Sequence, residues 1–295
     1  MVQTKPKIAL VTARAHPNVN VDYDMPLILQ ALRDAGVDAS DPIWNDPEVD
    51  WSQFDLAILR STWDYSWDPA KYLAFVDHCA AQTQLLNPPS VVHWNADKHY
   101  VHALSAHGVP VMPTTYVAPG EAITLPEYAQ FVVKPTVSGG ARYAARYTAS
   151  EREQALEHIA YLHDNGTVAM IQPYNQHIDE HGERALVFLR GKFLHAIRKN
   201  AVLTEGTRFD EKKVAHPNVR PWTPSEDELS VAQQALAVAP QAEDLLYARV
   251  DLVSVDGRDP VVMELELIEP NLFLRFHPET MAAVVDAFTS AAVGR

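Results

Sequence analysis

Three acidic residues toward the end of the sequence have the spacing of a site for a hard divalent cation. In Met263-Glu-Leu-Glu-Leu267, an extended strand places Glu264 and Glu266 on one face and the apolar side chains on the other. Arg249 and Asp251 share a face of the preceding strand in the same way. A hairpin joining the two strands brings three carboxylates and one arginine together, and carboxylate oxygens favour Mg²⁺ or Mn²⁺.

The pairing within this hairpin depends on its turn, which we expect at Asp256-Gly257. With Val255 opposite Pro260, the polar residues form two facing pairs, Asp251 with Glu264 and Arg249 with Glu266. Like charges directly opposite each other destabilise a strand pair, so the first pair requires a cation. The alternative is a solvated outer face on which glutamates alternate with apolar residues and bind nothing.

A lysine followed by a glycine pair is a second candidate for ligand binding. Phe131-Val-Val-Lys-Pro135 is typical of a strand, and Lys134 near its end precedes Ser138, Gly139 and Gly140. A positive charge, a hydroxyl group and accessible backbone N–H groups can together hold a phosphate. The order differs from that of the P-loop, in which the lysine follows the glycines. A plain hairpin turn is the alternative.

His177-Ile-Asp-Glu-His181 matches the His-x-x-Glu-His pattern of a class of zinc hydrolases. That chemistry requires both histidines on one face of a rigid helix, with a further ligand downstream. The segment lies between Pro173 and Gly182 and has no apolar stripe, so we expect a solvated loop instead. His99 is interpreted as a surface residue, and Cys79 as a core residue rather than a nucleophile.

The elements that position these residues begin with a strand, loop and helix pattern that occurs twice. Strands are predicted at 7–13 and 55–60, and helices at 26–36 and 68–82. Such a pattern indicates a small parallel sheet with helices on its faces. Ligands bind beyond the carboxyl ends of such strands. Four loop residues are therefore candidates for a pocket, with solvated loop positions as the alternative: Arg14, Asp22, Arg60 and Asp64.

The rest of the chain mixes helices with short strands and hairpins, as α+β domains do. Asn87-Pro-Pro-Ser90 marks the first boundary. Helices are expected from Asn95 to Gly108, at the capping boxes Ser150–Glu153 and Ser225–Glu228, and from Pro278 onward. Strands are expected at 114–117, 131–135 and 167–174, and hairpins at 186–197 and 247–267. The resulting division of the chain is 1–92, 93–170 and 171–295.

Composition restricts the class of protein. The 295 residues contain 24 basic and 38 acidic side chains, for a formal net charge of −14. Such a field repels nucleic-acid phosphates and anionic lipids, so we expect neither nucleic acid nor a membrane as a partner. Hydrophobic residues make up 47% of the chain, which is typical of a globular protein. A single cysteine and a start without an apolar signal segment predict a cytoplasmic location.

Taken in order, these features resemble the ATP-grasp superfamily, and within it the glutathione-synthetase-like branch. The resemblance runs from Asn87 to Phe276. It implies an N-terminal α/β domain followed by two α+β subdomains that hold ATP between them. The nucleotide contacts that it implies are Lys98, Lys134 with the Ser138, Gly139 and Gly140 loop, the linker Gln172, Pro173 and Tyr174, and Glu183 with Asp179 as the alternative.

The resemblance further implies a metal site and a catalytic arginine. Asp251, Glu264 and Glu266 match the carboxylates that hold Mg²⁺ or Mn²⁺, although the family usually has Glu-x-Asn where this chain has Glu-x-Glu. Arg198 matches the basic residue near the γ-phosphate and the acceptor. The implied activity is that of a ligase, in which a carboxylate takes the γ-phosphoryl group of ATP and a nitrogen nucleophile captures the acylphosphate. Such phosphoryl transfer depends mainly on positioning and charge neutralisation.

Over the whole chain, three motifs resemble most closely the cyclo-ligases that act on O-ureido-D-serine in D-cycloserine biosynthesis: Thr12-Ala-Arg-Ala-His-Pro17, Arg60-Ser-Thr-Trp-Asp-Tyr65 and Glu264-Leu-Glu-Leu-Ile-Glu-Pro-Asn271. This resemblance implies activation of the substrate's own carboxylate, ring closure by its ureido nitrogen, and release of ammonia and carbon dioxide. A small amino-acid-like substrate also needs ionic partners. The candidates are Arg198 and Arg60 for the carboxylate, Asp22, Asp64 or Glu269 for the ammonium group, and Asn271 beside the metal strand.

Two other functions stay open at this point. An intermolecular carboxylate–amine ligase of the peptide or glutathione-synthetase type would require a second substrate that carries an amine. A nucleotide sensor without catalysis would be expected to lack the metal carboxylates, which this sequence keeps. A homodimer is a further expectation for the ligase.

Overall fold

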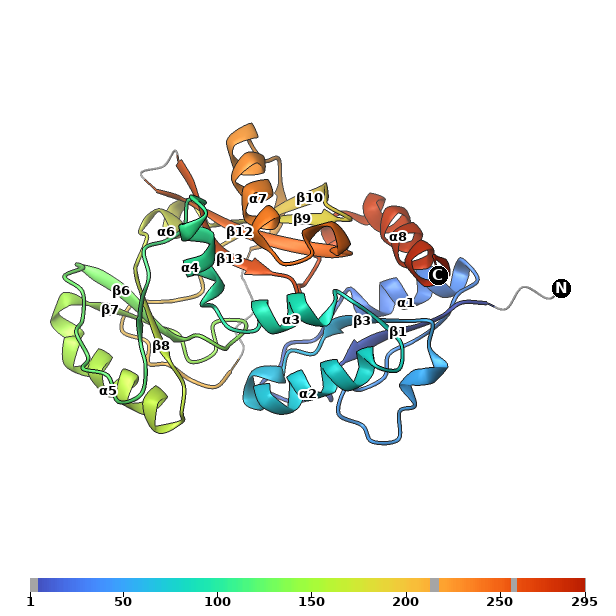
Figure 1. Ribbon diagram of the computed structural model, residues 1–295. Helices are drawn as coiled ribbons and strands as arrows, with labels where there is room; N and C mark the ends of the chain where they lie inside the picture. Colours follow the sequence, from blue (N-terminus) through green and yellow to red (C-terminus); the bar gives the residue numbers. More distant parts are fainter. Residues whose placement is uncertain (1–4, 213–217, 256–258, 295) are drawn as a thin grey trace.

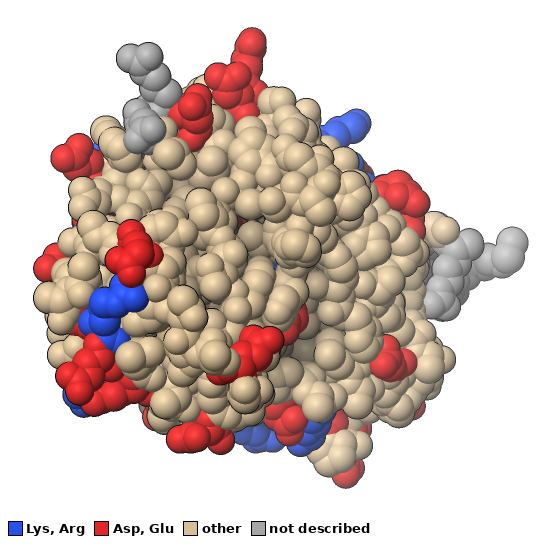
Figure 2. Space-filling view, turned by 60° about the vertical axis from the view of Figure 1, so that its left-hand side comes forward, with Lys and Arg blue, Asp and Glu red and all other residues tan. Residues whose placement is uncertain are grey.

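A computed structural model describes residues 5–212, 218–255 and 259–294 (Figure 1). These residues form three sheets that follow one another along the chain, with helices packed against them. Among the helices of this described part, none has both the length and the apolar character needed to cross a bilayer. On the face shown in Figure 2, acidic side chains are scattered and more frequent than basic ones, in keeping with the net charge of −14.

The N-terminal sheet is parallel, with the strand order β2-β1-β3-β4. Its strands are β1 (Lys7–Thr12), β2 (Asp38–Ser40), β3 (Leu56–Ser61) and β4 (Gln84–Leu86). Three helices pack against it: α1 (Met25–Asp34), α2 (Pro69–Ala80) and, from the far end of the chain, α8 (Met281–Val293) beside α1. The expected parallel sheet is confirmed. The prediction lacks β2 and β4 because three residues are too few to show a period.

Two short helices take the place of the single helix expected from Asn95. Helix α3 (Pro89–Asn95) ends where that helix should begin, and α4 (Tyr100–Ala106) follows after a break. The Asn95 amide does not cap a helix because it is used elsewhere. Its Nδ2 donates to the carbonyl of Leu265 at 2.8 Å, and its Oδ1 accepts from the N–H of Leu267 at 2.8 Å.

The central sheet is antiparallel, with the strand order β5-β8-β6-β7. Its strands are β5 (Thr115–Val117), β6 (Gln130–Pro135), β7 (Ala145–Thr148) and β8 (Ala169–Pro173), and α5 (Arg152–Asp164) packs against them. The capping box before α5 joins Thr148 to Glu151, two residues earlier than predicted. A turn of 3₁₀ helix precedes α5, so the box forms directly at the end of β7.

The C-terminal sheet has the strand order β11-β10-β9-β12-β13 and is antiparallel. Its strands are β9 (Glu183–Leu189), β10 (Lys192–Lys199), β11 (Arg220–Trp222), β12 (Tyr247–Val255) and β13 (Asp259–Glu266), and α7 (Glu226–Val238) packs against β12 and β13. The hairpin turn at Arg190-Gly191 is confirmed, with positive φ at both residues. The capping box at the start of α7 is confirmed as well.

The register between β12 and β13 brings the predicted polar pairs face to face, Asp251 with Glu264 and Arg249 with Glu266. Beside the turn, however, Val255 pairs with Asp259 instead of Pro260. A bulge between Asp251 and Leu252 shifts the ladder by one residue and restores the expected pairing at the carboxylates. The turn residues Asp256 and Gly257 lie outside the described residues.

The expected loop over residues 177–181 is wrong, since this segment forms the short helix α6 (His177–His181). The backbone N–H of His177 donates to Oδ1 of Asn175 at 3.0 Å. Ile178, the single apolar residue of the helix, is buried. Gly182 ends the helix with a φ of 67°, and a Cβ at this position would collide with the backbone of Lys199.

A buried histidine on α5 makes the stability of the fold depend on pH. His158 stacks on Phe209 with ring centroids 3.9 Å apart, and its Nδ1 lies 3.1 Å from the hydroxyl of Tyr147. Burial lowers the pKa of His158 to about 4. The unfolded chain therefore binds a proton below about pH 6.5 that the folded chain does not bind until about pH 4.

We expect stability to fall as the pH drops from about 6.5 to about 4, with about 3 kcal/mol contributed by this residue. Urea unfolding of the wild type and of His158→Gln at pH 7, 6 and 5 checks this expectation. The variant should lose less stability over this range. An equal loss of stability in both proteins would contradict the role given to His158.

Candidate active site

One pocket lies where the three sheets meet. It encloses about 260 Å³ and is lined by residues of the N-terminal, central and C-terminal parts, for example Tyr65, Lys134 and Glu264. Part of its wall is apolar, with Met112 and Ile178 in one cluster. The rest carries a dense set of charges. The pocket thus suits a ligand with a flat apolar part and a strongly charged part.

The three predicted metal carboxylates come together in this pocket region. Asp251, Glu264 and Glu266 offer oxygen atoms that lie within 4.8 Å of one another, and no other such group of ligands occurs in the described ranges. The side chains of Glu264 and Glu266 are each 27% exposed, whereas that of Asp251 is 1% exposed. The alternative of a solvated outer face is therefore excluded for this hairpin.

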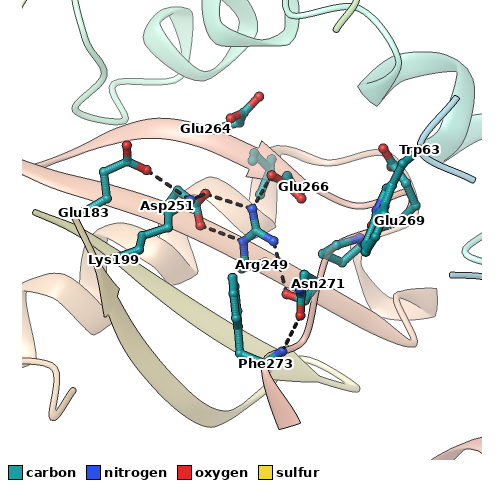
Figure 3. A network of polar contacts seen from close by, with 12 residues as sticks. Trp63, Glu183, Lys199, Arg249, Asp251, Glu264, Glu266, Glu269, Asn271 and Phe273 are labelled. Atoms are coloured by element: carbon teal, nitrogen blue, oxygen red, sulfur yellow. Dashed lines mark hydrogen bonds and ion pairs between the residues drawn. The ribbon is translucent and has the colours of Figure 1, made fainter. Parts of the chain in front are cut away.

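Two cations hold Asp251 in place (Figure 3). Arg249 donates from Nε to Oδ1 at 2.8 Å and from Nη2 to Oδ2 at 3.0 Å, and Lys199 Nζ lies 2.6 Å from Oδ2. Arg249 also pairs with Glu266, and Lys199 pairs with Glu183 at 3.0 Å. Burial alone would raise the pKa of Asp251, but Arg249 and Lys199 outweigh it and keep this pKa well below its ordinary value.

The two lysines implied for the nucleotide lie beside Glu264. Lys98 Nζ is 3.2 Å from Oε1 of Glu264 and 2.5 Å from the carbonyl oxygen of Ser138, so it joins the metal strand to the glycine loop. Lys134 is buried and lines the same pocket, as do Gly139 and Gly140. Burial lowers the pKa of Lys134, and the nearby Glu264 acts in the opposite direction.

The implied adenine linker also lies at the pocket. Gln172, Pro173 and Tyr174 line it, and Gln172 is fixed by a 2.9 Å hydrogen bond from Nε2 to the hydroxyl of Thr114. Glu183 lines the pocket as well. The alternative ribose contact, Asp179, instead accepts a hydrogen bond from the Tyr174 hydroxyl and pairs with an arginine outside the pocket lining.

Arg198 is not brought to the pocket, in contrast to its expected role. Its guanidinium donates to the carbonyl of Glu180 and points to the face of the sheet opposite Lys199. Burial, together with Arg220 and Arg184 on the neighbouring strands, lowers the pKa of this group. The geometry therefore does not support contact between Arg198 and a phosphate in the pocket.

Among the residues named as substrate candidates, Arg60 and Asp22 also lie elsewhere. Arg60 is buried, and its Nη1 donates to the carbonyl of Pro270 at 3.1 Å. Asp22 accepts the backbone N–H groups of Asp24 and Met25 at the start of α1. Neither lines the pocket, because both are used to hold backbone. Asn271 does line it.

Comparison with known proteins shows the family to which this chain belongs. The chain is 40% identical over 282 residues to the cycloserine biosynthesis protein DcsG of Streptomyces lavendulae, and the match covers 91% of this chain and 93% of that protein. This chain belongs to the D-cycloserine synthetase family. A model of the family described as the N-terminal domain of D-cycloserine synthetase DcsG matches residues 8–87.

Solved structures show the fold that this chain shares with other proteins. The crystal structure of D-cycloserine synthetase DcsG matches with a TM-score of 0.88 and 36% identity, over 97% of this chain and 99% of that one. A D-alanine–D-alanine ligase from Bacillus anthracis, complexed with ATP, matches with a TM-score of 0.68 and 14% identity over 98% of both chains. ATP-grasp ligase PsnB, complexed with minimal precursor, Mg and ADP, has a TM-score of 0.61 at 16% identity over 97% and 98%. The expected ATP-grasp fold is confirmed.

The residue that sequence reasoning missed in this D-cycloserine synthetase relative is Lys199. An unbroken ladder from the turn at Arg190-Gly191 would place Arg198 opposite Glu183. A bulge between Phe193 and His195 adds one residue to β10, so that Lys199 pairs with Glu183 instead. The acidic Glu183 near the start of the hairpin indicates that a basic residue pairs with it. It does not show whether that partner is Arg198 or Lys199.

The carboxylate set fits a hard divalent cation, the ion that the ATP-grasp fold implies. All the donors are oxygens, as Mg²⁺ requires. Glu264 and Glu266 are partly exposed, and each keeps lone pairs beyond its ion pair with Lys98 or Arg249. Asp251 is buried and engaged by Arg249 and Lys199.

Proposed function

We propose that this protein is an ATP-dependent cyclo-ligase that converts O-ureido-D-serine to D-cycloserine. The observation that carries the ligase proposal is a pocket lined by Lys98, Lys134, Arg249, Glu264 and Glu266, with the buried Asp251 in the same group of carboxylates. The substrate is inferred from the 40% identity to a cycloserine biosynthesis protein over most of both chains. The pocket's apolar wall beside Gln172–Tyr174 supports a place for adenine there.

The proposed reaction has three steps. A carboxylate oxygen of the substrate attacks the γ-phosphorus of ATP, and ADP leaves. The ureido nitrogen bonded to oxygen then loses its proton and attacks the acyl carbon, phosphate leaves, and a five-membered ring forms. Water finally removes the carbamoyl group, which breaks down to ammonia and carbon dioxide. Because the nucleophile belongs to the same molecule, its effective concentration is high and no second amine is needed.

The chain's own residues supply positioning and charge for these steps. Lys98 and Lys134 would bind phosphate oxygens, and the glycine loop that Lys98 contacts would shield the acylphosphate from water. Arg249 lines the pocket and would face the charge that develops at the acyl group. Glu264 and Glu266, backed by Asp251, would hold Mg²⁺, which when bound neutralises charge on the phosphates.

Mass spectrometry of the products tests this function. The purified protein with ATP, Mg²⁺ and O-ureido-D-serine is expected to release ADP, phosphate and D-cycloserine without any added amine. An absolute requirement for a second amine substrate would instead indicate an intermolecular ligase. No turnover with O-ureido-D-serine, but turnover with other amino-acid carboxylates, would contradict the proposed substrate while leaving the ligase in place.

Replacing Lys134 tests the nucleotide end of the pocket. Lys134→Ala is expected to weaken ATP binding by about 10- to 100-fold, the size expected for losing a charge-assisted hydrogen bond. Isothermal titration calorimetry measures this affinity. Lys192→Ala, on the exposed end of β10, serves as the control and should bind ATP like the wild type. Unchanged affinity in Lys134→Ala would contradict the assignment.

A further inference from the structure

The glycine loop carries a buried arginine to which the proposed reaction gives no role. Arg142 follows Gly140 by two residues and is completely buried, but unlike Gly140 it does not line the pocket. Its Nη2 donates to the carbonyl of Trp63, a residue 79 positions earlier that follows β3 of the N-terminal sheet. Burying a guanidinium costs free energy, which its contacts with the N-terminal part must offset.

An aromatic ring and two carboxylates lie around this guanidinium. Its Cζ is 4.8 Å from the ring centroid of Trp67, a distance at which an aromatic face attracts a cation. Burial lowers the pKa of Arg142, and Tyr65, Glu269 and Asp64 act in the opposite direction. The side chain that leaves the glycine loop is thus received by groups of the N-terminal part and of the segment after β13.

The surface that receives Arg142 is fixed by hydrogen bonds of its own. Trp63 Nε1 donates to the backbone carbonyl of Glu269 at 2.8 Å, so these two residues lie side by side (Figure 3). Asp64 accepts a hydrogen bond from Trp44 Nε1 at 2.7 Å. Gly139 approaches the same surface, where a Cβ would lie 3.9 Å from Oε1 of Glu269. The loop therefore packs on a rigid support.

The backbone on either side of Arg142 needs such a support. Ala141 and Tyr143 have φ values of 61° and 53°, in the left-handed region that residues other than glycine seldom adopt. Such conformations cost free energy and persist only where surrounding contacts hold them. The N–H of Tyr143 donates to the carbonyl of Asp210 at 2.7 Å, which holds one side of the loop. The contacts of Arg142 hold the other side.

We propose that Arg142 is a positioning residue that holds the glycine loop closed over the acylphosphate by docking on Trp63 and Trp67. The inference rests on the proposed function, because the acylphosphate of that reaction is what the loop would shield. A loop released from this contact would admit water. Water would then attack the acyl carbon, phosphate would leave, and the free carboxylate of the substrate would form again, so that ATP is consumed without ring closure.

The ratio of phosphate released to D-cycloserine formed tests this proposal. The wild type should release one phosphate for each ring that forms. Arg142→Ala and Trp67→Leu should each raise the ratio by about 3- to 10-fold, the size expected for losing one hydrogen bond or one cation–π contact. The double variant should not exceed Arg142→Ala by more than about twofold, because both changes remove the same contact.

Arg190→Ala is the matched control for this measurement. Arg190 also donates to a backbone carbonyl, that of Ala287 at 3.0 Å, but it does not line the pocket and lies at a hairpin turn. This variant should keep the wild-type ratio. A lower rate of Arg142→Ala with an unchanged ratio would overturn the proposal, since Arg142 would then have a structural role only.

Hydrogen exchange provides a second measurement that requires no turnover. The N–H groups of Tyr143 and Ala144 are hydrogen-bonded in the docked loop and should exchange at least about 10-fold faster in Trp67→Leu than in the wild type. Trp67 is 40% exposed, so this variant should fold and replaces Arg142→Ala if the latter does not. Equal exchange overturns the proposed docking. Faster exchange in a protein that does not act on O-ureido-D-serine supports the docking and contradicts the proposed function alone.

Discussion

Glu264→Gln is expected to reduce kcat/KM by at least about 100-fold while the protein stays folded. Glu264 has a partly exposed carboxylate, pairs with Lys98 at 3.2 Å and lies opposite Asp251 in the ladder. The amide keeps the shape of the side chain but loses the charge that both a divalent cation and Lys98 require. Release of ADP at several Mg²⁺ concentrations measures the effect, and circular dichroism reports on the fold.

Asp259→Asn is the matched control, because it removes a carboxylate from an exposed position on the same strand. It should leave the rate and its dependence on Mg²⁺ unchanged. A near-wild-type rate of Glu264→Gln at saturating Mg²⁺ would count against the metal site. Loss of the fold in this variant would mean that Glu264 has a structural role instead.

Lys199→Met is expected to lower the free energy of unfolding by about 3–5 kcal/mol. Lys199 is 2% exposed and pairs with both Asp251 and Glu183. Asp251 keeps its two bonds from Arg249 after the substitution, whereas Glu183 loses its ion pair with Lys199. Burial already raises the pKa of Glu183, and removing the lysine should raise this pKa further.

Urea unfolding at pH 7 and pH 5 measures this effect, and its sign follows from linkage. A carboxyl group whose pKa is higher in the folded state than in the unfolded state costs stability as the pH rises, so the deficit of Lys199→Met should shrink at pH 5. Lys192→Met changes an exposed lysine at the other end of β10 and should unfold like the wild type. An equal deficit at both pH values would argue against an unpaired Glu183.

Much of the site could be read from local patterns. The alternation in Met263–Leu267 places Glu264 and Glu266 on one face of a strand, and the lysine before Ser138–Gly140 indicates a phosphate loop. Both depend on residues close together in the chain, and side chains two apart in a strand share a face whatever the rest of the fold does. The same holds for the hairpin turn at Arg190-Gly191, which requires positive φ at both residues.

Predictions that depended on pairing between strands were less accurate, because bulges changed the expected register. The bulge between Phe193 and His195 exchanges Arg198 for Lys199 at the pocket, and the one after Asp251 restores a register that the turn would otherwise shift. One inserted residue turns every later side chain to the opposite face. Residue propensities do not reveal where such an insertion falls, because the packing of both faces of the sheet decides it.

The sequence by itself therefore determined the chemical inventory of this protein: which carboxylates share a strand face, which lysines precede a glycine loop, and which superfamily their order resembles. Only the tertiary structure decided that Lys199 serves the pocket, that Arg60 holds backbone instead, and that Glu269 stands beside Trp63. These outcomes join residues up to 210 positions apart. Contacts at such separations arise from the packing of whole elements, about which a local pattern carries no information.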